Sequence, residues 1–146
     1  MAAALYDKGR NRFARGDILW KAAAGSALRC CLVKDDYTPV LATHEFFSDL
    51  GANVVGNAGS ATRTNCPAMT LIDPVAGVCD ADDVTLTLVP GSVGICNYIC
   101  IFLDSGVDGT SPLIALIDDA TGIPVTPGGG NILITWDSGT NKIFKL

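Results

Sequence analysis

Charged side chains are scarce in this chain of 146 residues. They make up 17% of the sequence, against about 25% in an average soluble protein. Hydrophobic residues reach 49% and the mean hydropathy is +0.36. So much apolar surface offsets the entropy cost of folding and excludes a disordered chain. The shortage of surface charge predicts that other subunits cover part of the surface.

Long apolar runs are also missing. The best stretch, residues 95–103, includes Asn97 and Tyr98, whereas a membrane-spanning helix takes about 20 apolar residues. At the N-terminus, Asp7 and Lys8 interrupt the apolar start too early for a signal peptide. We therefore expect no membrane partner and synthesis in the cytoplasm.

Groups for acid–base and nucleophilic catalysis are few. His44 is the only histidine, so any catalytic triad would depend on it. The sequence has no G-x-S-x-G motif, and no Lys-Ser or Lys-Thr pair follows the glycine run 128–130, as a phosphate-binding loop requires. We expect no enzyme activity, no catalytic residue and no cofactor.

Six cysteines are present, and their spacing favours buried free thiols. Cys96 and Cys100 share one face of an expected strand about 13 Å apart, which is too far for a disulfide. Cys30 and Cys31 point to opposite faces of another strand. A cross-strand disulfide is the alternative. Zinc is disfavoured, because no second Cys or His pair accompanies Cys96 and Cys100.

Aspartates cluster in two places, which leaves calcium as an alternative. Asp80, Asp82 and Asp83 form one cluster, and Asp104 and Asp108 form the other. Neither matches a calcium-binding loop, and aspartate is common in turns. We expect no metal site.

Charge is divided unevenly along the chain. Residues 1–34 carry seven Lys or Arg against two Asp, whereas residues 35–140 carry thirteen Asp or Glu against Arg63 alone. A basic segment on an acidic body is typical of an arm that binds nucleic acid, a neighbouring copy or another protein. The alternative is a solvated helix face. With a pI near 4.5, we expect no direct nucleic-acid binding by the body.

The pattern of apolar residues predicts a mainly β fold. A short helix is expected over residues 5–15, ended by Gly16, and a second over 44–50, capped by Thr43. With little room for helical crossovers, short strands bounded by Gly, Pro or Asp indicate an antiparallel β-sandwich or jelly roll. The expected strands cover residues 18–22, 27–34, 54–55, 83–88, 94–103, 113–117, 124–125, 131–136 and 142–146, the last two joined as a hairpin.

We expect two parts, an N-terminal arm (residues 1–16) and a single β-sandwich domain (residues 17–146). In the arm, Tyr6 and Phe13 are predicted apolar anchors of an interface, since aromatic residues are enriched at interface centres. The alternative is that Tyr6 and Phe13 cap the domain's own sandwich. The predicted charged interface residues are Lys8, Arg10, Arg12 and Arg15.

Several segments resemble small structural proteins of tailed bacteriophages. The start of the chain carries LYDKGRNRFARGDILW (5–20) and KDDYTPVLATHEFFSDL (34–50), the middle carries VCDADDVTLTLVPG (78–91), and the end carries SPLIALIDDATGIPVTPGGGNILITWDSGTNKIFKL (111–146). The resemblance is to capsid decoration (cement) proteins and covers most of the chain. Residues 51–79 depart from it, being richer in cysteine and small residues.

The resemblance implies a structural role in the virion. Proteins of this family form small oligomers on the capsid exterior and bridge neighbouring major capsid protein subunits. The implied partners are therefore the major capsid protein and the chain itself, as a homodimer or homotrimer, after synthesis in the host cytoplasm. The alternatives are a tail, collar or fibre-base component and, less favoured, a glycan-binding β-sandwich module.

Overall fold

Two long strands that are apolar on both faces form the centre of the molecule. These are β2 (Ala27–Lys34) and β7 (Cys96–Asp104), which pair antiparallel with Cys31 opposite Cys100. The computed structural model describes residues 2–21 and 27–146. An antiparallel sheet in the order β1-β8-β7-β2-β3 is completed by β1 (Ala2–Leu5), β8 (Leu113–Asp119) and β3 (Val54–Val55).

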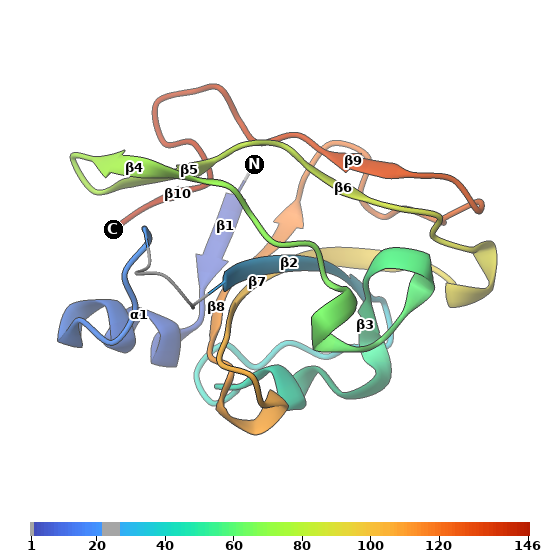
Figure 1. Cartoon of the computed structure of the whole chain (residues 1–146), viewed down its shortest axis with the longest axis horizontal. Coiled ribbons are helices and arrows are strands. Elements are labelled where there is room, and N and C mark those ends of the chain that lie inside the picture. The colour runs from blue at the N-terminus through green and yellow to red at the C-terminus, as the bar shows by residue number, and fades with distance from the viewer. Residues whose placement is uncertain (1, 22–26) are drawn as a thin grey trace.

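Two smaller antiparallel sheets cover one face of the five-stranded sheet (Figure 1). One has the order β10-β5-β4, and the other pairs β6 with β9. Their strands are β4 (Leu71–Val75), β5 (Val78–Ala81), β6 (Val84–Leu86), β9 (Ile132–Ile134) and β10 (Phe144–Lys145).

The opposite face of the five-stranded sheet is covered by loops and short 3-10 helices (Figure 1). Two apolar clusters result. Leu28, Cys30 and Leu32 of β2 belong to the cluster shared with the small sheets, whereas Cys31 and Val33 belong to the cluster beneath the loops. The central strands are therefore buried on both faces, as their sequence predicts. η1 (Phe47–Asn53) contributes Phe47 and Leu50 to the second cluster. The other 3-10 helices of the described chain are η2 (Asn57–Gly59), η3 (Arg63–Asn65), η4 (Gly91–Val93), which packs on the first cluster, and η5 (Asp108–Thr110).

The predicted fold class is confirmed. The chain is mainly β, with antiparallel sheets packed as a sandwich and a short α-helix, α1 (Asp7–Arg15). Gly16 ends α1 as predicted. Its left-handed backbone (φ 78°) lets its N–H donate to the Phe13 carbonyl at 3.1 Å, a conformation that glycine adopts at low cost.

The second predicted helix is displaced. Residues 44–50 were expected to be helical from Thr43, but η1 begins only at Phe47. The Asp49 carboxylate accepts the N–H groups of Glu45 and Phe46 at 2.7 and 2.9 Å. The Glu45 carbonyl also accepts the N–H of Leu113 at 2.8 Å. These contacts hold residues 45–46 extended against the start of β8, so the helical turn forms later.

Two further strand predictions are wrong. Residues 18–21 form no strand, although Ile18 and Trp20 are buried, and residue 22 lies outside the described residues. The expected hairpin of 131–136 with 142–146 does not form either, because β9 pairs with β6 and β10 pairs with β5. β1, β4 and β5 have no counterpart among the expected strands.

The N-terminal segment does not extend away from the domain as an arm. β1 pairs with β8 from Ala2 opposite Asp119 to Leu5 opposite Ala115, and α1 then packs on β8, where Gly9 is buried. Because β1 is a strand of the main sheet, residues 2–15 are part of the same packed unit as the sandwich.

Candidate interaction surface

Tyr6 lies in the protein's own core. Its exposed fraction is 0%, because it packs in the apolar cluster beneath the five-stranded sheet. Its N–H donates to the Ile114 carbonyl at 3.0 Å and continues the pairing of β1 with β8. Its hydroxyl lies 3.0 Å from the Tyr37 hydroxyl. The prediction of Tyr6 as an interface anchor is wrong, and the alternative, that it caps its own domain, is confirmed.

Tyr37 links Tyr6 to the only histidine. The Tyr37 hydroxyl lies 2.6 Å from Nδ1 of His44. Burial is the main cause that raises the pKa of Tyr37 to about 12, so this hydroxyl stays protonated at neutral pH. The row Tyr6–Tyr37–His44 therefore joins β1 to the loop beneath the sheet by hydrogen bonds between uncharged tyrosines and the imidazole.

Phe13 and Arg12 of α1 also face the domain. The Phe13 ring is half-buried and meets the Phe144 ring edge-on, with 6.1 Å between centroids. Arg12 is bound to Glu45 at 2.7 Å, and its guanidinium lies 5.3 Å from the centre of the Phe46 ring. These two predicted interface residues therefore attach the helix to β10 and to the loop before η1.

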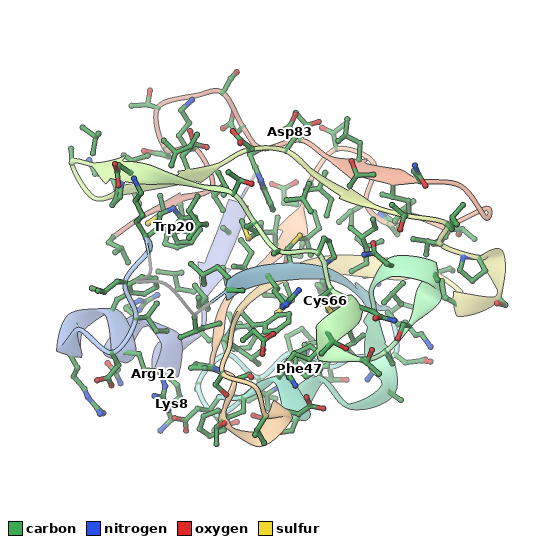
Figure 2. All side chains as sticks on the ribbon, in the orientation of Figure 1. Lys8, Arg12, Trp20, Phe47, Cys66 and Asp83 are labelled. Atoms are coloured by element: carbon green, nitrogen blue, oxygen red, sulfur yellow. The ribbon has the colours of Figure 1, made fainter. Side chains whose placement is uncertain are left out.

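Three of the predicted interface residues remain at the surface. Lys8 and Arg15, seven positions apart, lie on the outward side of α1, and Lys8 points away from the sheets (Figure 2). Arg15 pairs with Asp17 at 3.0 Å. Arg10 faces another side of the helix and pairs with Asp7 at 3.7 Å. All these side chains are largely exposed, and exposed ion pairs contribute at most about 1 kcal/mol, so the cations are accessible.

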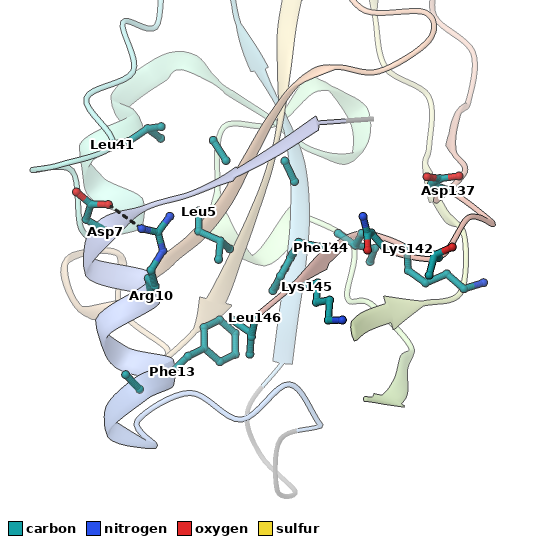
Figure 3. A pocket seen from close by; sticks show the side chains of 16 residues that line it. Leu5, Asp7, Arg10, Phe13, Leu41, Asp137, Lys142, Phe144, Lys145 and Leu146 are labelled. Carbon is teal, nitrogen blue, oxygen red and sulfur yellow. Dashed lines mark ion pairs between the residues drawn. The ribbon is translucent and has the colours of Figure 1, made fainter. Parts of the chain in front are cut away.

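A groove of about 970 Å³ runs between the beginning and the end of the chain. One wall is formed by β1 and α1, with Leu5, Arg10 and Phe13, and the other by the C-terminal segment, with Phe144 and Leu146 (Figure 3). The sequence does not predict this groove. Its two walls belong to different sheets, and the sequence of neither wall indicates which segment lies opposite it.

The acidic clusters are occupied by protein contacts. Asp104 accepts hydrogen bonds from Arg29 at 2.7 Å and from Arg63, while Asp108 accepts from Arg63 at 3.1 Å. Burial alone would raise the pKa of Asp104, but the hydrogen bonds from Gly106, Arg29 and Arg63 and the charge of Arg63 outweigh it and lower that pKa. This cluster ties β2 and η3 to the end of β7.

The cluster of Asp80, Asp82 and Asp83 also forms hydrogen bonds within the protein. The Asp83 carboxylate accepts the N–H of Trp136 at 3.1 Å, and Asp80 accepts the N–H of Ala81 at 2.9 Å. Within residues 2–21 and 27–146, no group of three or more His, Cys, Asp or Glu side chains is arranged to hold a metal ion.

Both tryptophans are buried, as the sequence indicates. Trp20 and Trp136 are 4% and 6% exposed, and their indole N–H groups donate to the carbonyls of Asp80 and Asp82 at 2.8 and 3.0 Å. Trp20 lies between the two layers of the sandwich (Figure 2). Neither ring is available to stack on a sugar, which weakens the glycan-binding alternative.

All six cysteines are free and buried, which confirms the thiol interpretation. Cys31 has two sulfur neighbours, Cys100 and Cys66. The hydrogen bond with Cys100 is the largest cause that raises the pKa of Cys31, and burial raises it further. Burial also raises the pKa of Cys79 to about 12 and that of Cys96 to about 11.

We expect these thiols to be unreactive in the folded protein. Only the thiolate is nucleophilic, and a pKa of about 11–12 at Cys96 and Cys79 leaves little thiolate near pH 8. Modification by Ellman's reagent should be about 100-fold slower than in concentrated guanidinium chloride, where the pKa returns to about 8.5. A native rate close to that of free cysteine at any of the six thiols would show that the thiol is not buried.

No helix in the described part of the chain has the length and apolar character needed to cross a membrane. No protein-family model, curated protein or solved structure matches this chain.

Proposed function

We propose that this chain is a structural virion protein that decorates the exterior of a bacteriophage capsid and stabilises it by bridging neighbouring major capsid protein subunits. One observation supports the proposal above others. The two end segments that resemble decoration proteins, residues 5–20 and 111–146, lie together in space, because α1 packs on β8 and Phe13 contacts Phe144. These two segments therefore form one continuous region of the folded protein.

This region has the properties of a binding surface. The outward side of α1 presents Lys8 and Arg15, while residues 35–140 carry a large excess of acidic groups. A basic helix on an acidic body orients the protein toward an acidic partner and away from others. Stable contacts of this kind bury about 1,200–2,000 Å², and many copies on one shell add their effects.

Co-sedimentation with undecorated capsids tests the proposal. We expect the wild-type protein to pellet with capsids, and the double variant Lys8→Glu/Arg15→Glu to bind at least about tenfold more weakly, since it reverses the charge of the contact. Lys34→Glu is the matched control, because Lys34 lies at the end of β2, and it should bind as the wild type does. Deleting residues 1–16 is a poorer test, because it removes β1 and the buried Tyr6.

The possible outcomes distinguish a wrong contact surface from a wrong function. Absence of wild-type protein from the capsid pellet would overturn the decoration role. Equal binding by the double variant would show that the outward side of α1 is not the contact. Electron microscopy of intact particles addresses the alternative of a tail, collar or fibre-base component, which predicts density at the tail and none on the shell.

A further inference from the structure

The outer edge of β1 is open. Among the residues that the structure describes, β8 is the only strand paired with β1. The Tyr6 N–H points to β8, and alternation along an antiparallel strand then directs the N–H and C=O groups of Ala3 and Leu5 to the other side. β1 therefore presents two residues with backbone donors and acceptors for another strand.

The groove gives access to this edge. Ala3, Ala4 and Leu5 all line it, although consecutive side chains of a strand point to opposite faces. Three consecutive residues can border one space only if the space follows the edge of the strand. Figure 3 shows the groove beside β1, with Phe13 and Phe144 at its apolar base.

β1 lacks the features that protect strand edges. Proteins block such edges with charged residues, proline or a covering segment, whereas β1 has the sequence AAAL. The loop at Leu41 reaches this side only beyond the strand, where its carbonyl accepts the Asp7 N–H at 3.0 Å. Ala4 is exposed and small, so another strand can approach closely. An edge of this kind pairs readily with a copy of itself, since two antiparallel AAAL strands bring no charge together.

We propose that β1 pairs antiparallel with β1 of a second copy around a twofold axis, which joins the two five-stranded sheets into one. Charge complementarity favours a second copy as the occupant. Asp118 and Asp119 end β8 beside the start of β1, since Asp119 lies opposite Ala2. Both are exposed, and neither forms an ion pair with any residue that the structure describes.

The twofold arrangement brings opposite charges together. Arg10 lies on the groove side of α1, which follows the end of β1. In an antiparallel pair, the end of one β1 lies beside the start of the other, and Asp119 of the second copy lies one strand further on, opposite its Ala2. Among the described residues, Arg10 forms an ion pair with Asp7 alone, at 3.7 Å, and both side chains are more than half exposed. Each Arg10 therefore gains a carboxylate of the other copy as a second partner. The twofold axis repeats this contact, so the dimer contains it twice.

The mass of the purified protein in solution tests the pairing without reference to capsids. Sedimentation equilibrium should give twice the 15.1 kDa of one chain. Ala4→Lys places two like charges near the axis, and we expect it to raise the dimer dissociation constant about fivefold. Ala4→Ser, at the same exposed position, should leave the constant within about twofold of wild type. A monomeric or trimeric wild type, or an Ala4→Lys dimer as tight as wild type, would overturn the inference.

Two further measurements assign the contact. Arg10→Asp should weaken the dimer about tenfold, and Arg10→Asp combined with Asp119→Arg should restore it, because the pair is reversed across the axis. Hydrogen exchange should protect the Ala3 and Leu5 amides only at dimer-forming concentrations, whereas the Tyr6 amide, bound to β8, is protected in the monomer too. Failure of the charge reversal together with concentration-independent exchange at Ala3 and Leu5 would place the dimer contact elsewhere and refute β1 pairing.

Discussion

Replacing Asp104 with asparagine is expected to lower the free energy of unfolding by about 3 kcal/mol, because it leaves two arginines without their shared carboxylate. The Asp104 side chain is only 9% exposed, and Arg29 and Arg63 are 22% and 14% exposed. Arg63 also donates to the Gly106 carbonyl at 2.7 Å, and Arg29 to that of Cys66. Loss of the carboxylate therefore loosens η3, β2 and the turn after β7 together. Urea unfolding measures the change.

Asp108→Asn is the matched control for this prediction. Asp108 binds the same Arg63 guanidinium at 3.1 Å, but its side chain is 57% exposed, so its loss should change stability by less than about 1 kcal/mol. If both variants lowered the free energy of unfolding by similar amounts, burial would not be what makes the Asp104 ion pairs more stabilising than the Asp108 ion pair.

Acid should reduce the effect of Asp104→Asn. The pKa of Asp104 is lower in the folded protein than its ordinary value, so its charge contributes fully above about pH 4. That contribution is lost as the pH falls through the lowered pKa of the folded state. The stability difference between the wild type and Asp104→Asn should therefore shrink below about pH 4, and a difference that stays constant into strong acid would contradict this account.

The central sheet could be predicted from sequence because its signal is local. β2 and β7 are apolar at nearly every position, which predicts strands buried on both faces, and the two clusters on either side confirm it. The end of α1 could also be predicted, since Gly16 supplies the left-handed residue that the last turn needs.

The short strands at the sheet edges pair with segments far away in the sequence, and their own sequences carry no comparable strand pattern. AAAL favours helix over strand, yet residues 2–5 form β1 because β8 offers its edge. Pro74 and Gly77 indicate turns, which hides the short strands β4 and β5 around them. Short strands at sheet ends therefore follow from tertiary pairing rather than from their own sequence.

The predicted interface residues differ in exposure for the same reason. Lys8, Arg10 and Arg15 are charged and lie where solvent reaches them. Tyr6 differs because its burial depends on Tyr37, 31 positions away, and the sequence near Tyr6 gives no sign of that contact. An aromatic residue in a basic segment can serve an interface or the core, and only the packed fold distinguishes them.

Gly9 is the position where helix propensity and packing should oppose each other most strongly. In the interior of a helix, Gly→Ala ordinarily stabilises by about 1 kcal/mol. Here a β-carbon on Gly9 would lie 2.5 Å from the Leu113 carbonyl oxygen and 3.1 Å from Cα of Ile114. Both contacts are with the backbone of β8, which cannot turn away as a side chain can. Gly9 is therefore what lets α1 lie directly on the sheet.

We expect Gly9→Ala to destabilise the protein by about 2 kcal/mol, since overpacking of a tight contact costs about 1–3 kcal/mol and the displaced helix also loses packing of Phe13 on Phe144. Asn11→Ala is the control, because Asn11 is exposed on the same helix and the change should stabilise by up to about 0.7 kcal/mol. Thermal unfolding of both variants should therefore give shifts of opposite sign. A stabilised Gly9→Ala protein would show that α1 can move off β8 at little cost, and the helix would then be only loosely attached to the sheet beside the proposed binding surface.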